Sequence, residues 1–497
     1  MQSAARVSVC RYLTILQQIA LQYRQAEKIP MCADTAGNSV RGGKKHQESS
    51  PWRKFRGVFL CSESLFRRIK CIGTDSANRD TERRIQMKKA AEADACRTEI
   101  NKINGCGSGA YPENNAPDRK YMELAMELAL RGCGKADPNP LVGAVIVKNG
   151  EVIGKGYHTK YGCMHAEREA LADCRSSPAG AVMYVTLEPC CHHGKQPPCT
   201  DAVIDAGISH VVVGSADPNP LVSGKGVEIL KAHGINVTEN FMRKECDALN
   251  PAFFKFIRTG MPYVVMKYAM TMDGKIATRT GASKWITSEA ARKQVHEDRN
   301  RCMAIMAGIG TVLSDNPLLN CRIPGGRNPV RVICDTHLRI PETSRIVQTA
   351  GEYRTLIATA QTDEGGGMQN SGVPAGKGRG RSYAEKCSFL TAKGCELLYI
   401  PIKDGHLNLE ELMRKLGEMD ISSVMLEGGG TLNWSALEAG IVDRLQVYMA
   451  PKIFGGKDAP SPVGGMGAEL PSDAFTAGKP KVTFLGDDIL IESELRR

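Results

Sequence analysis

Residues 186–199 read TLEPCCHHGKQPPC and hold three cysteines and two histidines within fourteen positions. Such a stretch can bind a metal, form disulfides or be a polar loop. About two dozen residues upstream, the sequence HAE at 165–167 begins an expected helix. One imidazole and two thiolates suit Zn²⁺ and leave the fourth tetrahedral position for water, which is the arrangement of catalytic zinc sites. The two segments together predict a catalytic zinc centre.

The candidate ligands are His165, Cys190 and Cys199. Glu167 lies two residues after the histidine, on the same helical turn, where a carboxyl group can shuttle protons rather than bind the metal. This is the plan of zinc deaminases, in which a metal-activated water attacks an amino-bearing ring carbon. A structural zinc knuckle is the alternative, but such a site more often uses four protein ligands and would not need Glu167.

The spacing leaves competing ligands. The usual deaminase signature is P-C-x-x-C, whereas eight residues separate Cys190 from Cys199 here. Side chains alternate at a strand end, so Cys191 is expected to point away from the metal if Cys190 points toward it. His192 and His193 are interpreted as solvent-facing residues of the connecting loop rather than as ligands.

Composition places the chain among soluble globular proteins. Its 497 residues are 42% hydrophobic and 24% charged, which is ordinary for that class. No apolar run is long enough to span a bilayer. The size of the chain and the absence of a clean signal peptide favour a reducing compartment for its 18 cysteines, and hence metal binding over disulfides. We therefore expect a cytoplasmic protein with no membrane association.

Residues 1–115 lack sustained periodicity and are interpreted as a basic, disordered extension. Residues 1–86 carry 16 basic and 7 acidic residues, which accounts for +9 of the net charge of +11. The segment is either a disordered arm or Arg-rich targeting peptide, or it lies upstream of a true start at Met87, which we favour. A chain starting at Met87 is expected to fold, because the extension has too little apolar surface to offset its ordering entropy.

Residues 116–250 show strands alternating with helices, which predicts an α/β layered domain. Apolar residues at helical spacing predict a helix at 118–132, with Asp118 as its N-cap and Gly132 as its stop. A Lys-Asn-Gly turn predicts a hairpin within 141–158. Further helices are expected at 165–174, 200–207 and 224–234, and strands at 181–190 and 210–217. Residues 216–220, ADPNP, are interpreted as a turn with no catalytic role.

Residues 258–497 predict a second α/β domain. A strand at 262–277 that runs into a loop is followed by a strand, Gly turn and helix at 301–317, and the expected later strands are 330–335, 354–360, 395–401, 423–430 and 443–451. Helices are expected at 408–419 and 431–440, and residues 362–388 are interpreted as a flexible, Gly-rich insertion. No G-x-G-x-x-G follows a strand. However, LEGGGTLNWSAL at 426–437 places three glycines between a strand and a helix, where backbone amides can approach a phosphate.

Four stretches of the first domain resemble a known enzyme family: DPNPLVGAVIVKNG (137–150), GYHTKYGCMHAE (156–167), VTLEPCCHHGKQPPCTDAVIDAGI (185–208) and ADPNPLVSGKG (216–226). They are similar to the deaminase half of the bifunctional riboflavin-biosynthesis deaminase–reductases, and the similarity runs from about 117 to the C-terminus. The family deaminates a phosphoribosylaminopyrimidine and then reduces the ribosyl group to a ribityl chain with NADPH. Its longer cysteine spacing matches this chain, while Cys191 stands where serine is common.

The resemblance implies site residues for the deaminase. His165, Cys190 and Cys199 would bind zinc, and Glu167 would be the proton shuttle. The implied substrate contacts are Asn139, His158 and Lys195, which agrees with an amide that can bind a pyrimidine edge and an ammonium that can bind a phosphate. Packing and turn formation are the alternatives for His158 and Asn139.

The second domain resembles the family's reductase half through MTMDGKIAT (270–278), GASKWIT (281–287) and GIGTVLSDNPLLNCR (308–322), which implies a dihydrofolate-reductase-like fold. The implied substrate residues are Lys267, Ser283, Arg299, Leu319, Arg322 and Glu427. Arg299 and Arg322 are expected to hold the ribose phosphate, because a guanidinium fork suits phosphate oxygens. The implied NADPH contacts are Ala269, Trp285, Thr311, Asp315, Gly429, Gly430 and Thr431.

Two other functions compete with this one. A nucleic-acid-editing zinc deaminase shares the HAE and PC elements, but it would need a basic, aromatic-lined surface, and aromatic residues are only 5% of the chain. A non-catalytic, zinc-stabilised binding protein is the other. The nucleic-acid-editing alternative also gives the second domain no role. The expected partners are therefore a small phosphoribosyl-pyrimidine and further copies of this chain, with no nucleic acid.

Overall fold

The computed structural model describes residues 117–194, 196–220, 222–360 and 381–496. The extension, Met87, Lys195 and most of the predicted Gly-rich insertion therefore lie outside the described residues. Within the described ranges, no helix combines the length and the apolar character that a bilayer crossing requires.

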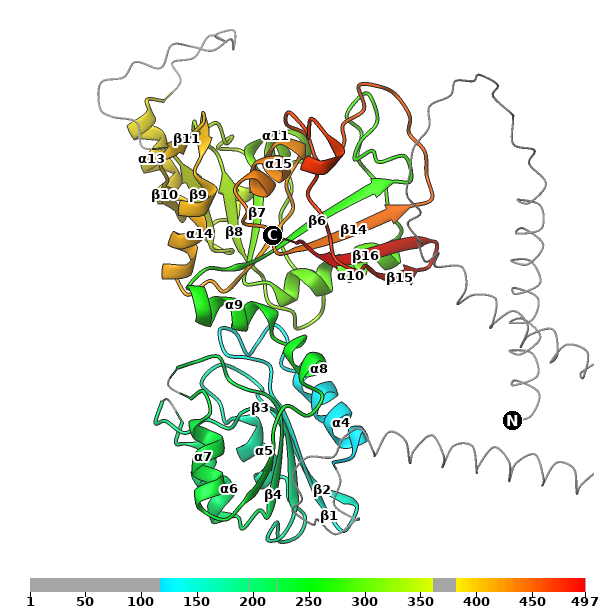
Figure 1. The fold of residues 1–497 in the computed structure, drawn as a ribbon. Coiled ribbons are helices and arrows are strands. Elements are labelled where there is room, and N and C mark those ends of the chain that lie inside the picture. Colours follow the sequence, from blue (N-terminus) through cyan, green and yellow to red (C-terminus); the bar gives the residue numbers. More distant parts are fainter. Residues whose placement is uncertain (1–116, 195, 221, 361–380, 497) are drawn as a thin grey trace, which may run out of the picture. The chain divides into compact units, whose positions relative to one another are not determined.

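The first domain contains a five-stranded sheet in the order β2-β1-β3-β4-β5 (Figure 1). Its strands are β1 (Gly143–Lys148), β2 (Glu151–Tyr157), β3 (Val182–Leu187), β4 (His210–Ser215) and β5 (Asn236–Thr238). The predicted hairpin is confirmed: β1 pairs antiparallel with β2, and Asn149 and Gly150 between them both have positive φ, as a tight two-residue turn requires. The pairs β3–β4 and β4–β5 are parallel.

Helices cover both faces of this sheet. They are α4 (Arg119–Leu130), α5 (Ala166–Ala172), α6 (Cys199–Asp205), α7 (Lys225–Ala232) and α8 (Arg243–Asp247), and α9 (Pro251–Thr259) follows them in the chain. On β1, Ile146 packs in one core with residues of α5, α6 and α7. The neighbouring Val145 packs in the other core with residues of α4 and α8. This alternation gives the predicted three-layer arrangement.

The predicted start of the first helix is also confirmed. The Asp118 side chain accepts a hydrogen bond from the backbone N–H of Lys120 at 3.0 Å and so caps α4. The buried face of the helix includes Met122 and Leu128. The helix ends at Leu130, two residues before the predicted stop at Gly132.

The second domain contains a nine-stranded sheet in the order β10-β9-β8-β7-β13-β6-β14-β16-β15. Its strands are β6 (Tyr263–Thr271), β7 (Ala304–Gly308), β8 (Val330–Cys334), β9 (Thr355–Thr359), β10 (Cys395–Tyr399), β13 (Ser423–Leu426), β14 (Arg444–Ala450), β15 (Lys481–Leu485) and β16 (Asp488–Glu494). The strands from β10 to β14 pair in parallel, and β16 and β15 complete the sheet antiparallel. A separate two-stranded ribbon joins β11 (Ile402–Lys403) to β12 (His406–Leu407).

Both faces of this sheet also carry helices, namely α10 (Glu289–Arg301), α11 (Ile309–Asp315), α12 (Arg345–Gln348), α13 (Tyr383–Ala392), α14 (Leu409–Glu418) and α15 (Gly430–Glu438). On β13, Val424 packs in the core that contains residues of α14 and α15. The adjacent Met425 packs instead with Val295 of α10. The two cores explain why the central strands are hydrophobic at every position rather than at alternate ones.

Two differences from the sequence predictions lie in the second domain. The insertion predicted at 362–388 ends earlier, because Ser382 caps α13 and forms a capping box with Glu385. The C-terminal hairpin of β15 and β16, together with the short 3-10 turn η1 (Pro471–Asp473), was not anticipated. The β15 edge leaves Val482 51% and Phe484 72% exposed.

Candidate active sites

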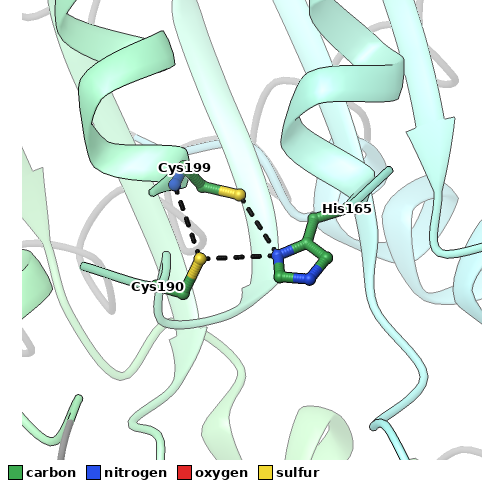
Figure 2. Close-up of side chains that lie close together, drawn as sticks. All are labelled: His165, Cys190 and Cys199. Carbon is green, nitrogen blue, oxygen red and sulfur yellow. Dashed lines mark hydrogen bonds between the residues drawn. The ribbon is translucent and has the colours of Figure 1, made fainter. Parts of the chain in front are cut away.

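The three predicted zinc ligands lie together at the carboxyl end of β3 (Figure 2). His165 is the N-cap of α5, Cys190 follows β3, and Cys199 is the first residue of α6. The His165 Nδ1 atom lies 3.4 Å from the Sγ atom of each cysteine. Among the described residues this is the only cluster of three or more His, Cys, Asp or Glu side chains close enough to share a metal ion.

The donor atoms fit Zn²⁺. A tetrahedral site with Zn–S of about 2.3 Å and Zn–N of about 2.0–2.1 Å has an S···N edge of roughly 3.6 Å, close to the separations found here. The hydrogen bond between the two thiols lowers the pKa of Cys190 to about 4 and raises the pKa of Cys199. A bound cation would replace the proton that remains on Cys199.

Glu167 lies beside this cluster on the first turn of α5 and is 3% exposed. Burial, followed by the charge of Cys190, raises the pKa of its carboxyl to about 7. A carboxyl group whose pKa is near neutrality can both accept and return a proton. Its position and its protonation equilibrium therefore suit the predicted role of proton shuttle.

Asn139 and His158 line the same cavity as Glu167 and are hydrogen-bonded to each other. The Asn139 Nδ2 atom lies 3.1 Å from His158 Nε2, and His158 Nδ1 lies 3.0 Å from the carbonyl oxygen of Met164. Burial lowers the pKa of this imidazole. The ring therefore donates from Nδ1 and accepts at Nε2, so that it orients the Asn139 amide. Lys195, the third predicted contact, lies outside the described residues.

The loop between the cysteines only partly matches its prediction. Cys191 lies outside the ligand cluster, and His193 is exposed. His192 also lies outside the ligand cluster, but it is half-buried and lines the cavity, so it is less open to solvent than predicted. Its Nδ1 atom is buried.

Sequence reasoning gave no role to the loop at 216–226. Asp217 and Asn219 of this loop line the cavity. Glu188 is buried, and its carboxylate accepts hydrogen bonds from the backbone N–H groups of Asp217, Gly224 and Gly226 at 3.3, 3.1 and 3.1 Å. The acidic side chain of Glu188, close to the predicted ligand Cys190, is the feature of the sequence that could have indicated this contact. Its partners, however, lie 29 to 38 positions away in the sequence.

The second site is a cavity of about 880 Å³ at the carboxyl ends of the parallel strands of the reductase-like domain. It brings together nine of the residues predicted from sequence: Lys267, Ala269, Ser283, Thr311, Asp315, Glu427, Gly429, Gly430 and Thr431. The glycines form the N-terminus of α15, and a methyl group placed on Gly429 would lie 3.9 Å from Thr311 Oγ1. This open backbone turn at a helix N-terminus fits a phosphate of a dinucleotide.

A buried ion network borders this cavity, which Lys267 and Glu427 line. The Arg299 Nε and Nη2 atoms donate to the two carboxylate oxygens of Glu427 at 2.7 and 2.9 Å, and Lys267 Nζ donates at 3.4 Å. Burial alone would raise the pKa of the Glu427 carboxyl, but these two cations hold it well below its usual range. Glu427 is therefore a fixed anion that orients both cations.

The remaining predicted residues do not line the cavity. Leu319 packs its side chain into the core beside Val312. Trp285 is 61% exposed, with the Arg292 guanidinium 4.5 Å from its ring centroid. Arg322 is exposed and is hydrogen-bonded to His296. Sequence reasoning also missed Thr336, His337 and Arg339, which line the cavity beyond β8 and carry no recognisable motif.

Comparison with known proteins identifies both domains. A family model of the cytidine and deoxycytidylate deaminase zinc-binding region matches residues 115–215, and the RibD C-terminal domain matches residues 262–484. The riboflavin biosynthesis protein RibD of Actinobacillus pleuropneumoniae is 48% identical, over 76% of this chain and 94% of that protein. RibD of Escherichia coli K12 is 40% identical, over 68% of this chain and 89% of that protein.

Solved structures show the same relationship. RibD of Acinetobacter baumannii is 34% identical and superimposes with a TM-score of 0.65, covering 76% of this chain and 99% of that chain. The diaminohydroxyphosphoribosylaminopyrimidine deaminase/5-amino-6-(5-phosphoribosylamino)uracil reductase of Thermotoga maritima is 37% identical, with a TM-score of 0.64 and coverage of 76% and 98%. These matches confirm a deaminase-like domain followed by a dihydrofolate-reductase-like domain. The chain therefore belongs to the RibD family, the bifunctional riboflavin-biosynthesis enzymes that join a zinc-dependent deaminase to an NADPH-dependent reductase.

Proposed function

We propose that His165, Cys190 and Cys199 hold the zinc of the deaminase and that Glu167 carries its protons. The observation that supports this assignment is the convergence of two thiols and one imidazole beside a buried carboxyl whose pKa is near 7. Zinc held by these three side chains would supply the Lewis acidity that makes a water molecule nucleophilic toward the amino-bearing ring carbon. Glu167 takes a proton from the attacking water and delivers it to the departing ammonia.

The substrate of this site is 2,5-diamino-6-(5-phosphoribosylamino)pyrimidin-4-one. Asn139, oriented by His158, binds the edge of the pyrimidine, and Lys195 binds the phosphate. The hydrogen bond between Asn139 and His158 supports the first part, because it fixes which amide atom faces the cavity. A nucleic-acid-editing activity is not favoured, because the second domain of this chain binds a dinucleotide and such an activity gives that domain no role.

In the reductase, bound NADPH would supply a hydride for the anomeric carbon of the open-chain imine, and this hydride together with a proton on the imine nitrogen would give the ribityl chain. Lys267, Ser283 and Glu427 contact the substrate, and Arg299 holds Glu427 in place. The remaining proposed substrate contacts are Leu319 and Arg322. We assign the NADPH contacts to Ala269, Trp285, Thr311, Asp315, Gly429, Gly430 and Thr431. The protein contributes positioning and the exclusion of water.

We also propose that residues 116–250 and 258–497 are the two catalytic domains and that 1–115 is an extension. The separate sheets of the two domains and the family matches at 115–215 and 262–484 support these bounds. The protein is expected to act in the cytoplasm, where a thiolate ligand set stays reduced.

A homo-oligomer is the proposed assembly, because β15 leaves the apolar Val482 and Phe484 exposed along a sheet edge. Light scattering of the full chain tests this proposal. Phe484→Glu is expected to lower the measured mass, whereas a monomeric wild-type protein would contradict it.

The activity test supplies the pyrimidine nucleotide and then NADPH to the purified full chain, with zinc quantified in the same sample. We expect ammonia release to precede NADPH oxidation, at one zinc per chain. Zinc binding without ammonia release would favour a zinc-stabilised binding protein and would contradict the proposal.

A further inference from the structure

The two arginines expected to hold the substrate phosphate have very different partners. Arg299 forms a two-point ion pair with the buried carboxylate of Glu427, so its charge is already matched. Arg322 has no carboxylate within ion-pair distance among the described residues. Instead, its Nε and Nη2 atoms both point at the Nε2 atom of His296, at 3.0 and 2.9 Å.

These contacts fix the state of the imidazole. A guanidinium has only donors, so His296 Nε2 must accept and the ring hydrogen must lie on Nδ1. Burial and the charges of Arg299 and Arg322 lower the pKa of this imidazole to about 4. His296 is 9% exposed, and its Nδ1 atom is buried with no partner in the described part of the chain. The ring is therefore neutral, and it accepts hydrogen bonds at Nε2.

The surroundings of Arg322 are cationic. Burial, followed by the charges of Arg299, Arg345 and Arg292, lowers the pKa of its guanidinium. An acidic acceptor in place of His296 would cancel part of this positive field, whereas a neutral acceptor orients Arg322 and leaves its charge intact. A phosphate dianion is the ligand class that such an oriented, unmatched guanidinium binds.

α10 places both arginines of the reductase site. It carries Arg299 itself, and three residues earlier, on the same face of the helix, it carries His296, which reaches Arg322. We propose that His296 is a positioning residue of the reductase, which fixes the Arg322 guanidinium without neutralising it and so prepares it for the phosphate of the substrate. This inference rests on the proposed role of Arg322 in substrate binding.

The test compares His296→Gln, which keeps a neutral acceptor, with His296→Glu, which replaces it with an anion. Lys293→Ala is the matched control, since Lys293 is exposed on the same helix. Full-length, zinc-loaded protein is assayed with supplied deaminated intermediate, and KM for the intermediate, KM for NADPH and kcat are determined separately. We expect His296→Gln and the control to stay within about threefold of wild type. His296→Glu should raise KM for the intermediate by at least about tenfold, the loss expected for one charge-assisted hydrogen bond, with KM for NADPH unchanged.

A second readout is independent of turnover. Inorganic phosphate should raise the melting temperature of wild type and His296→Gln, and should raise that of His296→Glu much less. Equal KM values for the Gln and Glu variants, or a fall in kcat alone, would overturn the role of His296. A wild-type protein that shows the phosphate effect but does not reduce the intermediate would instead contradict the proposed function of the site and leave the phosphate site supported.

Discussion

Replacing Glu427 by Gln tests whether the buried ion network stabilises the reductase domain. The substitution keeps the shape of the side chain but removes the charge that faces Arg299 and Lys267. These side chains are only 12–13% exposed, so water cannot replace the lost anion. Breaking a buried pair by removing one partner costs about 3–5 kcal/mol. In a domain of this size each kcal/mol shifts the melting temperature by about 2–4 °C, so the expected fall is roughly 6–20 °C.

The same domain offers a matched control. Arg354 binds Glu396 with the same two-point geometry, at 2.9 and 3.1 Å, but the two side chains are 46% and 48% exposed. An exposed pair contributes about 0–1 kcal/mol, so Glu396→Gln should shift melting by at most a few degrees. Calorimetry on the full chain measures both variants, and deamination should be retained in each. Equal shifts for the two substitutions would refute the argument that burial sets the cost.

Further predictions concern the zinc site and pH. Cys190→Ser should lose zinc and deamination while Cys191→Ser keeps both, measured by metal analysis and ammonia release; equal zinc loss would contradict the ligand assignment. Glu167→Gln should lower deamination by about 10²–10⁴-fold while zinc and reduction of supplied intermediate are retained, and unchanged ammonia release would assign the proton to another group. The pKa of His296 in the folded protein is lowered to about 4, because of burial and because the charges of Arg322, Arg299 and Lys267 oppose its protonation. The contribution of His296 to the free energy of unfolding is therefore present above pH 6.5 and is lost as the pH falls toward 4. The free energy of unfolding should change with pH by at most about 1.4 kcal/mol per pH unit for this group. Urea titrations should show a smaller pH dependence in His296→Gln, and an unchanged dependence would exclude His296 as its source.

Motifs made the local parts of this protein predictable. Asp118 marked the start of α4, Asn149 and Gly150 marked a hairpin, and the three glycines after β13 marked the cavity, because each signal acts within a few residues of itself. The resemblance to the family added the ligand set that spacing had left open. These predictions therefore covered most strands of both sheets and the centre of each site.

Contacts between distant segments could not be predicted in this way. The carboxylate of Glu188 binds backbone groups of a loop about thirty positions later, and no side-chain pattern marks a backbone donor. His192 is a polar loop residue and is predicted to face solvent, but its side chain lines the cavity. The pairing of His296 with Arg322 depends on where α10 packs, which the sequence of either residue does not reveal.

The position of β13 in the sheet has a consequence for how the protein is made. Among the described strands, β6 pairs only with β13 and β14, and Val264 pairs with Val424. At about 5–20 residues per second, a ribosome needs roughly 8–30 s to travel from β6 to β13. During that interval the apolar β6 has been synthesised but its neighbours have not. The deaminase sheet needs no strand beyond Thr238 and can close while the reductase is still being translated. This chain is therefore expected to need a chaperone most while its reductase domain is being synthesised.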